Sequence, residues 1–332
     1  MSETTVLPLI NSIFIPGDAR KTVANIEDEE SRKIAQAELY YFSGQAEECC
    51  KLIEPYLSNP RIDLQLSACL LYTFSNLTLG RVFDSHRGLR EIQHTCKEVY
   101  NLSDSAEDKA LCLFAGYLSA ILLHLSIDHL PDFKRYARDL PYGIRIFASY
   151  MMAHAVYLKG DYGQALGICQ SAFFLTEDPY PISMVYLYCM IAMCEISQKH
   201  QNEAIVALKK AWLMAEKDKF LEPFIEHHGL LQGLLEATIR KSNPKLYKRI
   251  SQSSIAFSRG WMTIHNHESK SHVTDALTTM EFSIAMLACR NWSNQEIGDY
   301  LGISLNTVKH YLSDIFMKLD VSKRDKLKEY VL

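Results

Sequence analysis

Residues 293–319 read SNQEIGDYLGISLNTVKHYLSDIFMKL and predict two short helices joined by a tight turn. Ser293 and Glu296 have the spacing of a capping box, in which each side chain accepts a hydrogen bond from the other residue's backbone N–H. Gly302 can adopt the left-handed conformation that ends the first helix, and Ser304 can cap the second. The inward face of the second helix is then defined by apolar residues at helical spacing: Val308, Leu312, Ile315 and Leu319.

Polar residues occupy the opposite side of this second helix over its first two turns. They are Asn306, Thr307, Lys309, His310 and Ser313. In a helix-turn-helix, the second helix enters the major groove of DNA, and its first turns reach base edges and phosphates. The pattern therefore predicts that these residues contact double-stranded DNA.

The flanking sequence extends this unit to four predicted helices. Thr278 and Glu281 form a second capping box, which opens a scaffold helix before the tight turn. Ser322 and Asp325 can open a closing helix after it. The apolar residues of that closing helix are Leu327, Tyr330 and Val331. We expect residues 275–332 to form one small four-helix domain.

This segment resembles the LuxR-type (NarL/FixJ-type) DNA-binding domain. The matching positions are Leu277, Thr278, Glu281, Ser293, Asn294, Glu296, Ile297, Leu301, Ser304, Thr307, Val308, Lys309, Leu312, Ile315, Lys318, Leu319, Val321 and Arg324. The sequence departs from the family pattern at Met280, where Arg is usual, at Tyr311, where His is usual, and at Asp320, where Gly or Asn is usual. The resemblance implies a domain that binds DNA and dimerises through its last helix.

The resemblance and the outward positions together give the expected site residues. DNA contacts are expected from Asn294, Asn306, Thr307, Lys309, His310, Ser313, Lys318, Lys323 and Arg324. Dimer contacts are expected from Leu327, Tyr330 and Val331.

The predicted domain is not basic overall. Residues 272–332 contain seven Lys and Arg against eight Asp and Glu, although six of the seven basic residues lie from Lys309 onward. Binding to DNA phosphates depends on local rather than net positive charge. We therefore expect one copy to bind DNA weakly and a homodimer on a two-part site to bind usefully.

Residues 31–264 predict an array of helical hairpins. In residues 150–175, YMMAHAVYLKGDYGQALGICQSAFFL, an apolar helix ends at Gly160 and the next helix begins around the small residue Ala165, five positions on. A small residue lets the two helices of a hairpin cross closely, and each hairpin can bury its apolar face against its neighbour. The same step recurs at Gly44 with Cys49, Gly80 with Ser85, and Lys199 with Ala204.

A further, degenerate unit is expected around Ile127, with residues 131–140 (PDFKRYARDL) as its second helix. The array resembles a tetratricopeptide-type solenoid. Strand patterns are nearly absent, so the expected fold is all-α: a helical-repeat solenoid followed by the small helix-turn-helix domain.

Tyrosines on the first helices of the hairpins would line a concave face or pack between repeats. They are Tyr40, Tyr41, Tyr150, Tyr157, Tyr186 and Tyr188.

The remaining segments complete the expected domain plan. Residues 1–30 are expected to form an N-terminal segment, and residues 253–266 a last helix that caps the array. Residues 265–274 predict a polar linker. Its three histidines, His265, His267 and His272, have a spacing that would suit a metal ion, but we favour a solvated linker because no fourth ligand is evident. The paired histidines at 227 and 228 favour a surface or groove position over catalysis.

Composition describes an ordinary globular protein. The 332 residues are 48% hydrophobic with a net charge of -4, and the apolar stretch 6–15 is interrupted by Pro8 and Asn11. This predicts a cytoplasmic chain without a membrane span or signal peptide. The nine cysteines form no CxxC pair, which favours small core residues of a reducing compartment over metal ligands or redox pairs.

No catalytic motif is present: the sequence lacks a P-loop, a dinucleotide fingerprint, a GxSxG elbow and an HExxH pair. We therefore expect no enzyme activity, no metal and no cofactor. The sequence favours a bacterial, homodimeric transcriptional regulator whose repeats sense a small molecule, peptide or protein partner or mediate oligomerisation. The alternative is a helical-repeat scaffold that acts by protein contact and whose C-terminal module does not bind DNA.

Overall fold

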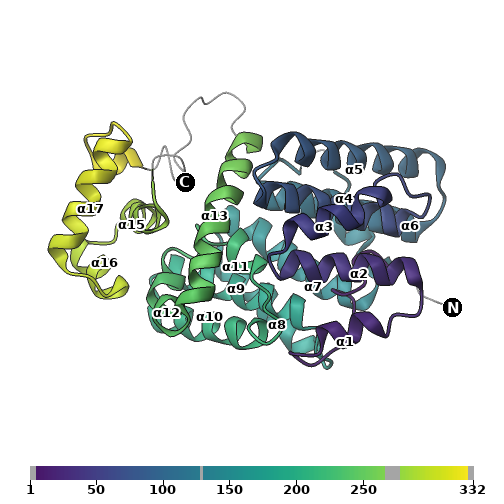
Figure 1. Ribbon diagram of the computed structural model, residues 1–332, viewed down its shortest axis with the longest axis horizontal. Coiled ribbons are helices and arrows are strands. Elements are labelled where there is room, and N and C mark those ends of the chain that lie inside the picture. The colour runs from purple at the N-terminus through teal and green to yellow at the C-terminus, as the bar shows by residue number, and fades with distance from the viewer. Residues whose placement is uncertain (1–4, 128–129, 266–276, 328–332) are drawn as a thin grey trace.

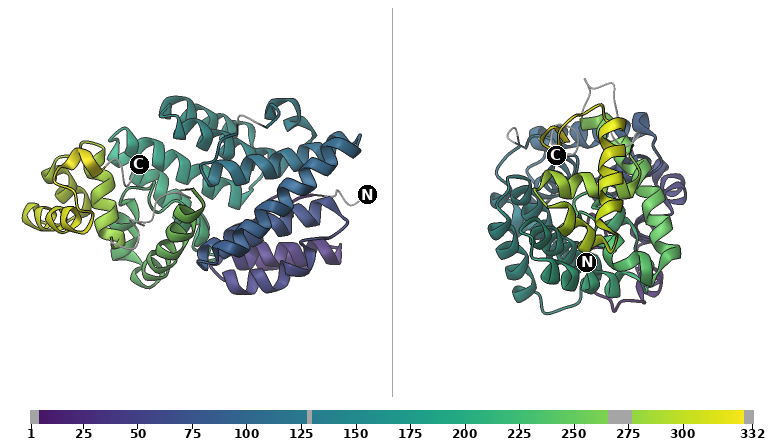
Figure 2. Two further views of the ribbon diagram at one scale, coloured as in Figure 1. Left: turned by 90° about the horizontal axis from the view of Figure 1, so that it is seen from above. Right: turned by 90° about the vertical axis from the view of Figure 1, so that its left-hand side faces the viewer.

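The structure is a computed structural model, and it describes residues 5–127, 130–265 and 277–327. Every regular element in these ranges is helical, so the predicted all-α fold is confirmed (Figure 1). The helix-turn-helix elements lie at one end of the molecule, beside the last helices of the repeat region, as Figure 1 and the left view of Figure 2 show.

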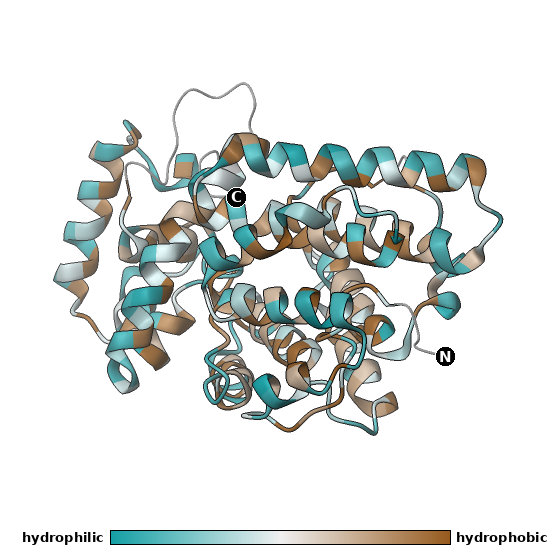
Figure 3. Cartoon of the chain, turned by 45° about the vertical axis from the view of Figure 1, so that its right-hand side comes forward, coloured by the Kyte–Doolittle hydropathy of each residue, from teal (hydrophilic) through white to brown (hydrophobic). Residues whose placement is uncertain are grey.

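Helical hairpins make up most of the described repeat region, each built from two consecutive helices that pack together. They are α2 (Glu29–Phe42) with α3 (Ala46–Ile53), α4 (Ile62–Thr78) with α5 (Val82–Leu102), α7 (Tyr142–Leu158) with α8 (Tyr162–Leu175), and α9 (Pro181–Ser197) with α10 (Gln201–Ala215). Helix α6 (Ala106–Leu122) lies between the second and third pairs in the chain. The outer helices carry both brown and teal residues in Figure 3, as amphipathic helices do.

The two helices of each hairpin are joined by the same type of junction. A residue with positive φ ends the first helix, and the next backbone N–H donates to a carbonyl five residues back, as from Gln45 to Tyr40 and from His200 to Glu195. The positive-φ residues are Gly44, Gly80, His124, Gly160 and Lys199. The small residues predicted to follow the junctions, Cys49, Ser85, Ala165 and Ala204, are all 0% exposed.

The degenerate unit differs from its prediction. The positive-φ residue after its first helix is His124 (φ 53°), close to the expected position around Ile127, but its second half is not the expected helix. The helix predicted over residues 131–140 is wrong: this segment forms two 3-10 turns, η2 (Phe133–Arg135) and η3 (Ala137–Asp139). The segment begins at one proline, and Pro141 follows its end and holds the preceding residue in an extended conformation.

The N-terminal segment belongs to the repeat core. Its apolar side chains Val6, Leu7, Leu9, Ile10 and Phe14 are at most 5% exposed. The backbone N–H groups of Leu9 and Ile10 donate to the Glu38 carboxyl group in α2 at 2.7 and 3.0 Å, and the N–H of Leu7 donates to Ser67 in α4 at 2.9 Å. Residues 5–14 therefore join the first hairpins to each other, and helix α1 (Ala19–Ala24) follows them.

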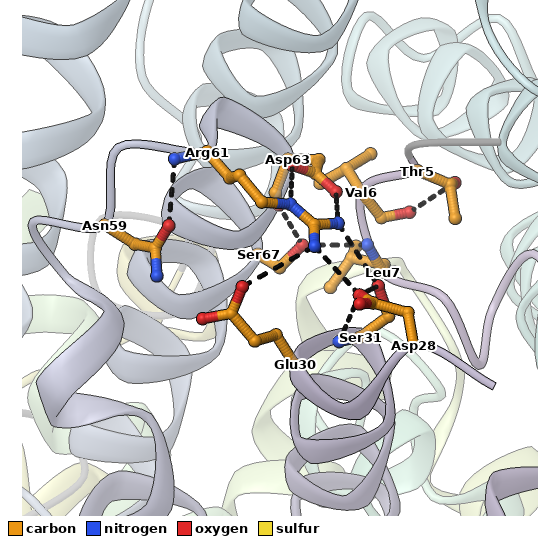
Figure 4. Close-up of polar contacts among 10 residues, drawn as sticks. All are labelled: Thr5, Val6, Leu7, Asp28, Glu30, Ser31, Asn59, Arg61, Asp63 and Ser67. Carbon is orange, nitrogen blue, oxygen red and sulfur yellow. Dashed lines mark hydrogen bonds and ion pairs between the residues drawn. The ribbon is translucent and has the colours of Figure 1, made fainter. Parts of the chain in front are cut away.

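An arginine connects the starts of α2 and α4 (Figure 4). The Arg61 guanidinium lies 2.9 Å from Asp28 and 2.8 Å from Asp63, with Glu30 at 3.6 Å. Asp28 also caps α2 by accepting from the Ser31 backbone. Hydrogen bonds from Ser31 and Arg61 lower the pKa of Asp28 to about 2. This aspartate is therefore ionised at neutral pH, as both of its roles require.

The chain after α10 returns across the array. Helices α11 (Glu222–Glu226), α12 (Leu234–Ser242) and α13 (Pro244–His265) follow, and α13 begins earlier than the cap predicted from residue 253. The Leu221 N–H donates to Phe42 O at 2.6 Å, and Trp261 Nε1 donates to Leu122 O at 2.9 Å. These contacts tie the end of the repeat region to its first half, with α13 against α4 (Figure 1).

Glu38 gives a pH-dependent stability. Burial raises its pKa from 4.5 to about 8, although the two backbone donors oppose this shift. The carboxyl proton of Glu38 stays bound in the folded state up to about pH 8, whereas the unfolded state loses it near pH 4.5. The contribution of the protonated Glu38 to stability is therefore complete below pH 4.5 and is lost as the pH rises toward 8.

We predict that Glu38→Gln reduces the loss of unfolding free energy between pH 5 and pH 8, by up to about 1.4 kcal/mol per pH unit. Urea unfolding at both pH values measures this difference. Glu48→Gln is the matched control, since Glu48 is exposed on α3. If Glu38→Gln and the parent lose the same free energy between the two pH values, the protonated state assigned to Glu38 is incorrect.

Candidate nucleic-acid interface

Two capping boxes fix the first helices of the C-terminal domain, α15 (Thr279–Cys289) and α16 (Asn294–Leu301). Glu281 N donates to Thr278 Oγ1 at 3.3 Å, and Thr278 N donates to Glu281 Oε2 at 2.8 Å. The Ser293 pair has the same geometry, with Glu296 N to Ser293 Oγ at 3.2 Å and the return bond at 2.5 Å. Both predicted boxes are therefore confirmed.

The turn between α16 and α17 (Leu305–Lys318) is tight. Gly302 has φ 67°, as predicted, and the Ile303 N–H donates to Gly298 O at 2.9 Å. Ser304 Oγ accepts from Thr307 N at 3.1 Å and caps α17. A Cβ on Gly298 would lie 2.8 Å from Ile303 O, so this glycine permits the close approach. Residue spacing alone does not reveal this second glycine requirement.

The two faces of α17 are separated as predicted. Val308, Leu312, Ile315 and Leu319 are at most 7% exposed. On the other face Asn306, Lys309, His310 and Ser313 are exposed, and Thr307 is half-buried with its hydroxyl 2.8 Å from Ser304 Oγ. Figures 1 and 2 both show α17 on the side of the domain away from the repeats, so the repeat helices leave its outward face open.

Two of the expected DNA-contacting cations make contacts within the domain. Lys318 Nζ lies 2.8 and 2.7 Å from the two Glu281 carboxylate oxygens. Burial acts to raise the Glu281 pKa, but hydrogen bonds from Lys318 and Thr278 outweigh it and leave the pKa lowered. Glu281 is thus the ionised partner of Lys318, while its carboxylate also completes the first capping box.

Arg324 connects three parts of the domain. Its guanidinium donates to Ala288 O at 3.1 Å, to Asn294 Oδ1 at 2.9 Å and to Trp292 O. Arg324 and Asn294, both expected to contact DNA, are therefore half-buried and bonded to each other. Lys323 is exposed beside them. The DNA contacts of all four residues, Lys318 included, remain predictions.

The expected dimer residues have different positions. Leu327 is 0% exposed and belongs to the domain's own core, in the 3-10 turn η4 (Arg324–Leu327). Tyr330 and Val331 lie outside the described residues, as does most of the predicted closing helix. Its role in dimerisation therefore remains a prediction.

The departures from the family pattern can be located. Asp320 has φ 52°, a conformation that Gly and Asn adopt readily and that Asp tolerates better than most residues. Met280 and Tyr311 are half-buried against the core. The Asp320 substitution therefore preserves the backbone, and the other two change side chains at the edge of the core.

The tyrosines of the first repeat helices are mostly internal. Tyr150 OH lies 2.7 Å from His227 Nε2 and 3.1 Å from His154 Nδ1, and Tyr186 OH donates to Glu226 at 2.6 Å. Tyr41, Tyr150, Tyr157 and Tyr186 are buried, whereas Tyr40 and Tyr188 are half-buried. These contacts correspond to packing between repeats, the second of the two alternatives.

The histidine at 227 is also internal. The surface or groove position favoured for His227 and His228 is wrong, since they are 1% and 4% exposed. Burial lowers the pKa of His227 to about 4 and raises that of Glu226 to about 7. The buried tyrosines, His227 and Glu226 form one cluster. Spacing along the sequence does not reveal it, because its members come from α2, α7, α9 and α11.

Neither a membrane span nor a metal cluster is found among the described residues: no helix there is long and apolar enough to cross a membrane, and no His, Cys, Asp and Glu group could hold a metal ion. The predicted linker histidines His267 and His272 lie outside the described residues, and the His265 side chain is not described either.

Comparison with known proteins identifies the C-terminal segment. Residues 275–331 match the sequence model of the family described as bacterial regulatory proteins, luxR family. The matched residues do not include the helical-repeat region. No curated protein matches the chain. The chain therefore carries a LuxR-type helix-turn-helix domain, and this match supports a DNA-binding transcription regulator.

We predict that Arg324→Ala loosens the domain. Loss of the hydrogen bonds from one charged group should lower local stability by about 2 kcal/mol. Hydrogen exchange of the α15 and α16 amides, followed by mass spectrometry, measures this change. Lys323→Ala is the control because Lys323 is exposed. Equal protection in the two variants would contradict the structural role of Arg324.

Proposed function

We propose that the protein is a cytoplasmic, sequence-specific DNA-binding transcriptional regulator that reads the major groove with α17. The observation that carries this proposal is the exposed polar face of α17, in a domain whose caps and turn have helix-turn-helix geometry. A helix held in this way can enter the groove without moving the repeat region.

The residues of that face have different proposed roles. Lys309 lies in the first turns of α17, where a lysine reaches a guanine edge or a phosphate. His310 and Ser313 lie one turn apart on the same face and are proposed to read bases, with Asn306 and Thr307 beside them. Lys323 is proposed to contact a phosphate.

We infer that Lys318, Arg324 and Asn294 act mainly by shaping this surface. Their charges and amide are already engaged by Glu281, by carbonyl groups and by each other. Because these contacts are short, a phosphate would have to share them or replace them. The free cationic charge of one domain is therefore small, which supports the proposal that two copies bind together.

A surface of the repeat region supports self-association. Helix α8 has the sequence YGQALGICQSAFFL, which contains no charged residue. Phe174 and Leu175 at its end are 87% and 67% exposed. Neighbouring exposed apolar side chains such as these can form part of a protein contact surface. We propose that α8 meets α8 of a second copy, so that the repeat region contributes to the homodimer.

The repeat region is also proposed to receive the signal. A ligand or protein partner that changes how hairpins pack would change how two copies are held together, and so change DNA occupancy. This role distinguishes a regulator from a scaffold with a silent C-terminal module. DNA binding by the full chain is the measurement that separates those two functions.

We predict that Lys309→Ala weakens binding of the full chain to a selected DNA site by about 1–3 kcal/mol, the value of one base contact. Lys209→Ala is the matched control, because Lys209 is an exposed lysine on α10 of the repeat region. Fluorescence anisotropy at fixed salt concentration measures both. Equal affinities for Lys309→Ala and the parent would mean that α17 is not in the groove.

We predict that Phe174→Asp reduces dimer formation and weakens binding to DNA with two half-sites, while leaving binding to one half-site unchanged. A buried charge at the proposed contact would cost free energy that the exposed monomer avoids. Phe83→Asp on α5 is the matched control, since Phe83 is 76% exposed. Sedimentation analysis measures the dimer, and identical dimer fractions in both variants would exclude the α8 contact.

A further inference from the structure

The helix-turn-helix domain is docked on the repeat region. Helix α16 packs against α12, and α15 packs against α13. Ser251 Oγ of α13 lies 3.0 Å from Thr279 Oγ1 of α15. A Cβ added to Gly229 or Gly233 would approach Phe282 or Leu301 within 2.9 Å, so glycines on the repeat side allow the close contact.

One arginine enters the repeat region from the DNA-binding domain. Arg290 Nη1 donates to Ser197 Oγ at 2.7 Å and to Tyr162 OH at 3.3 Å, and Nη2 donates to Tyr157 OH at 3.3 Å. Gln232 Nε2 also donates to Ser197 Oγ, at 2.9 Å. We call Tyr157, Tyr162 and Ser197 the hydroxyl socket.

The hydroxyl socket lies where two hairpins meet. Tyr157 is in the last turn of α7 and Tyr162 begins α8, whereas Ser197 ends α9. Tyr157 OH and Ser197 Oγ are themselves 3.1 Å apart. A shift of one hairpin against the next would separate these hydroxyls, so the fit of Arg290 depends on how the two hairpins pack.

Lys199 makes a second contact across the same boundary. Its ammonium group donates to Asn291 O at 3.2 Å, lies 3.6 Å from Glu296 Oε1 and is 5.7 Å from the centre of the Trp292 ring. Lys199 has φ 64°, at a junction position that three other hairpins fill with glycine. A residue other than glycine in this conformation costs conformational free energy. We infer that lysine occupies this position because its side chain contacts the DNA-binding domain.

Two features of the contact between the domains favour its release: the neutral partners of Arg290 and several buried polar atoms without partners among the residues that the structure describes. Within the described residues, no carboxylate pairs with Arg290, so the guanidinium is held by neutral hydroxyls. Five buried polar atoms at this boundary also lack a hydrogen-bond partner in the described chain. They are Gln232 Oε1, Glu236 Oε2, Ser283 Oγ, Arg290 Nε and Tyr300 Oη. An unsatisfied buried polar group costs free energy, which separation of the domains would recover through hydration.

We propose that Arg290 in the hydroxyl socket, together with Lys199, forms a reversible latch that fixes the orientation of the DNA-binding domain on the repeat region. This inference rests on the proposed function. When the latch is closed, α17 faces outward at a fixed angle, so two copies hold their recognition helices at one separation. When it opens, these contacts no longer set the angle of the domain, and affinity depends less on the distance between half-sites.

A disulfide trap tests the latch without DNA. Ser251→Cys with Thr279→Cys places two thiols across the boundary, and their rate of oxidation in a glutathione buffer reports docking. We expect ready oxidation in the otherwise unchanged chain. Adding Arg290→Ala should slow it by roughly tenfold, as loss of one charged hydrogen-bonding group predicts. Adding Lys209→Ala should leave the rate unchanged.

Two further variants protect this test against misfolding. Lys199→Gly suits the positive φ of its junction, so it keeps the hairpin fold and should still slow oxidation. Ser197→Ala should slow oxidation in the parent but have little additional effect beside Arg290→Ala, because both remove one interaction. Equal oxidation rates in all variants, or no oxidation in the parent pair, would overturn the latch.

DNA binding then tests its consequence. Full-length parent and Arg290→Ala are compared on DNA whose two half-sites are separated by a series of distances. The parent should prefer one separation, and Arg290→Ala should lose that preference. Identical profiles would overturn the proposed link between latch and DNA. Absence of binding by every variant would refute the proposed function, while the oxidation rates would still decide whether the latch exists.

Discussion

Close crossing of two helices after a left-handed residue is the constraint on which both parts of this protein depend. In the repeat hairpins, Gly44, Gly80 and Gly160 end the first helix, and a fully buried small residue follows at the crossing. In the helix-turn-helix, Gly302 ends α16 and Gly298 lets α17 approach. A Cβ at Gly298 would lie 2.8 Å from a backbone oxygen, so a larger residue would force the two helices apart.

Local structural features can be predicted from the sequence, because each depends on a few neighbouring residues. Both capping boxes and the inward face of α17 follow from spacing alone. Residues 131–140 form 3-10 turns instead of the predicted helix, and Pro141 accounts only for the extended conformation of Leu140, where the second turn ends. The junction at Lys199 follows from the repeat step, but the positive φ of Lys199 and of His124 is not evident from the sequence, because neither residue is glycine.

Contacts between residues far apart in the sequence could not be predicted. Lys318 pairs with Glu281 and Arg324 bonds to Ala288 O, and these partners are 37 and 36 residues apart. Both cations therefore looked available for DNA. Likewise, His227 is buried by helices from separate hairpins, and Glu38 becomes an internal acceptor only because residues 5–14 fold back onto α2.

The arrangement suggests why a DNA-binding domain is carried by a helical array. Packing between hairpins is a collective property that a bound ligand or partner can change. The hydroxyl socket lies between two hairpins, and Arg290 connects it to the domain that carries α17. In the proposed mechanism, a change in the repeats thus reaches α17 through its orientation, while the side chains proposed to read bases stay the same.

The most direct test of DNA reading is selection of bound sites from random DNA by the full-length chain, followed by sequencing. We expect enrichment of a short shared motif that occurs twice in each selected DNA, as two copies of α17 require. A pool that stays as diverse as the starting DNA after repeated rounds would contradict the central claim that the exposed face of α17 reads sequence.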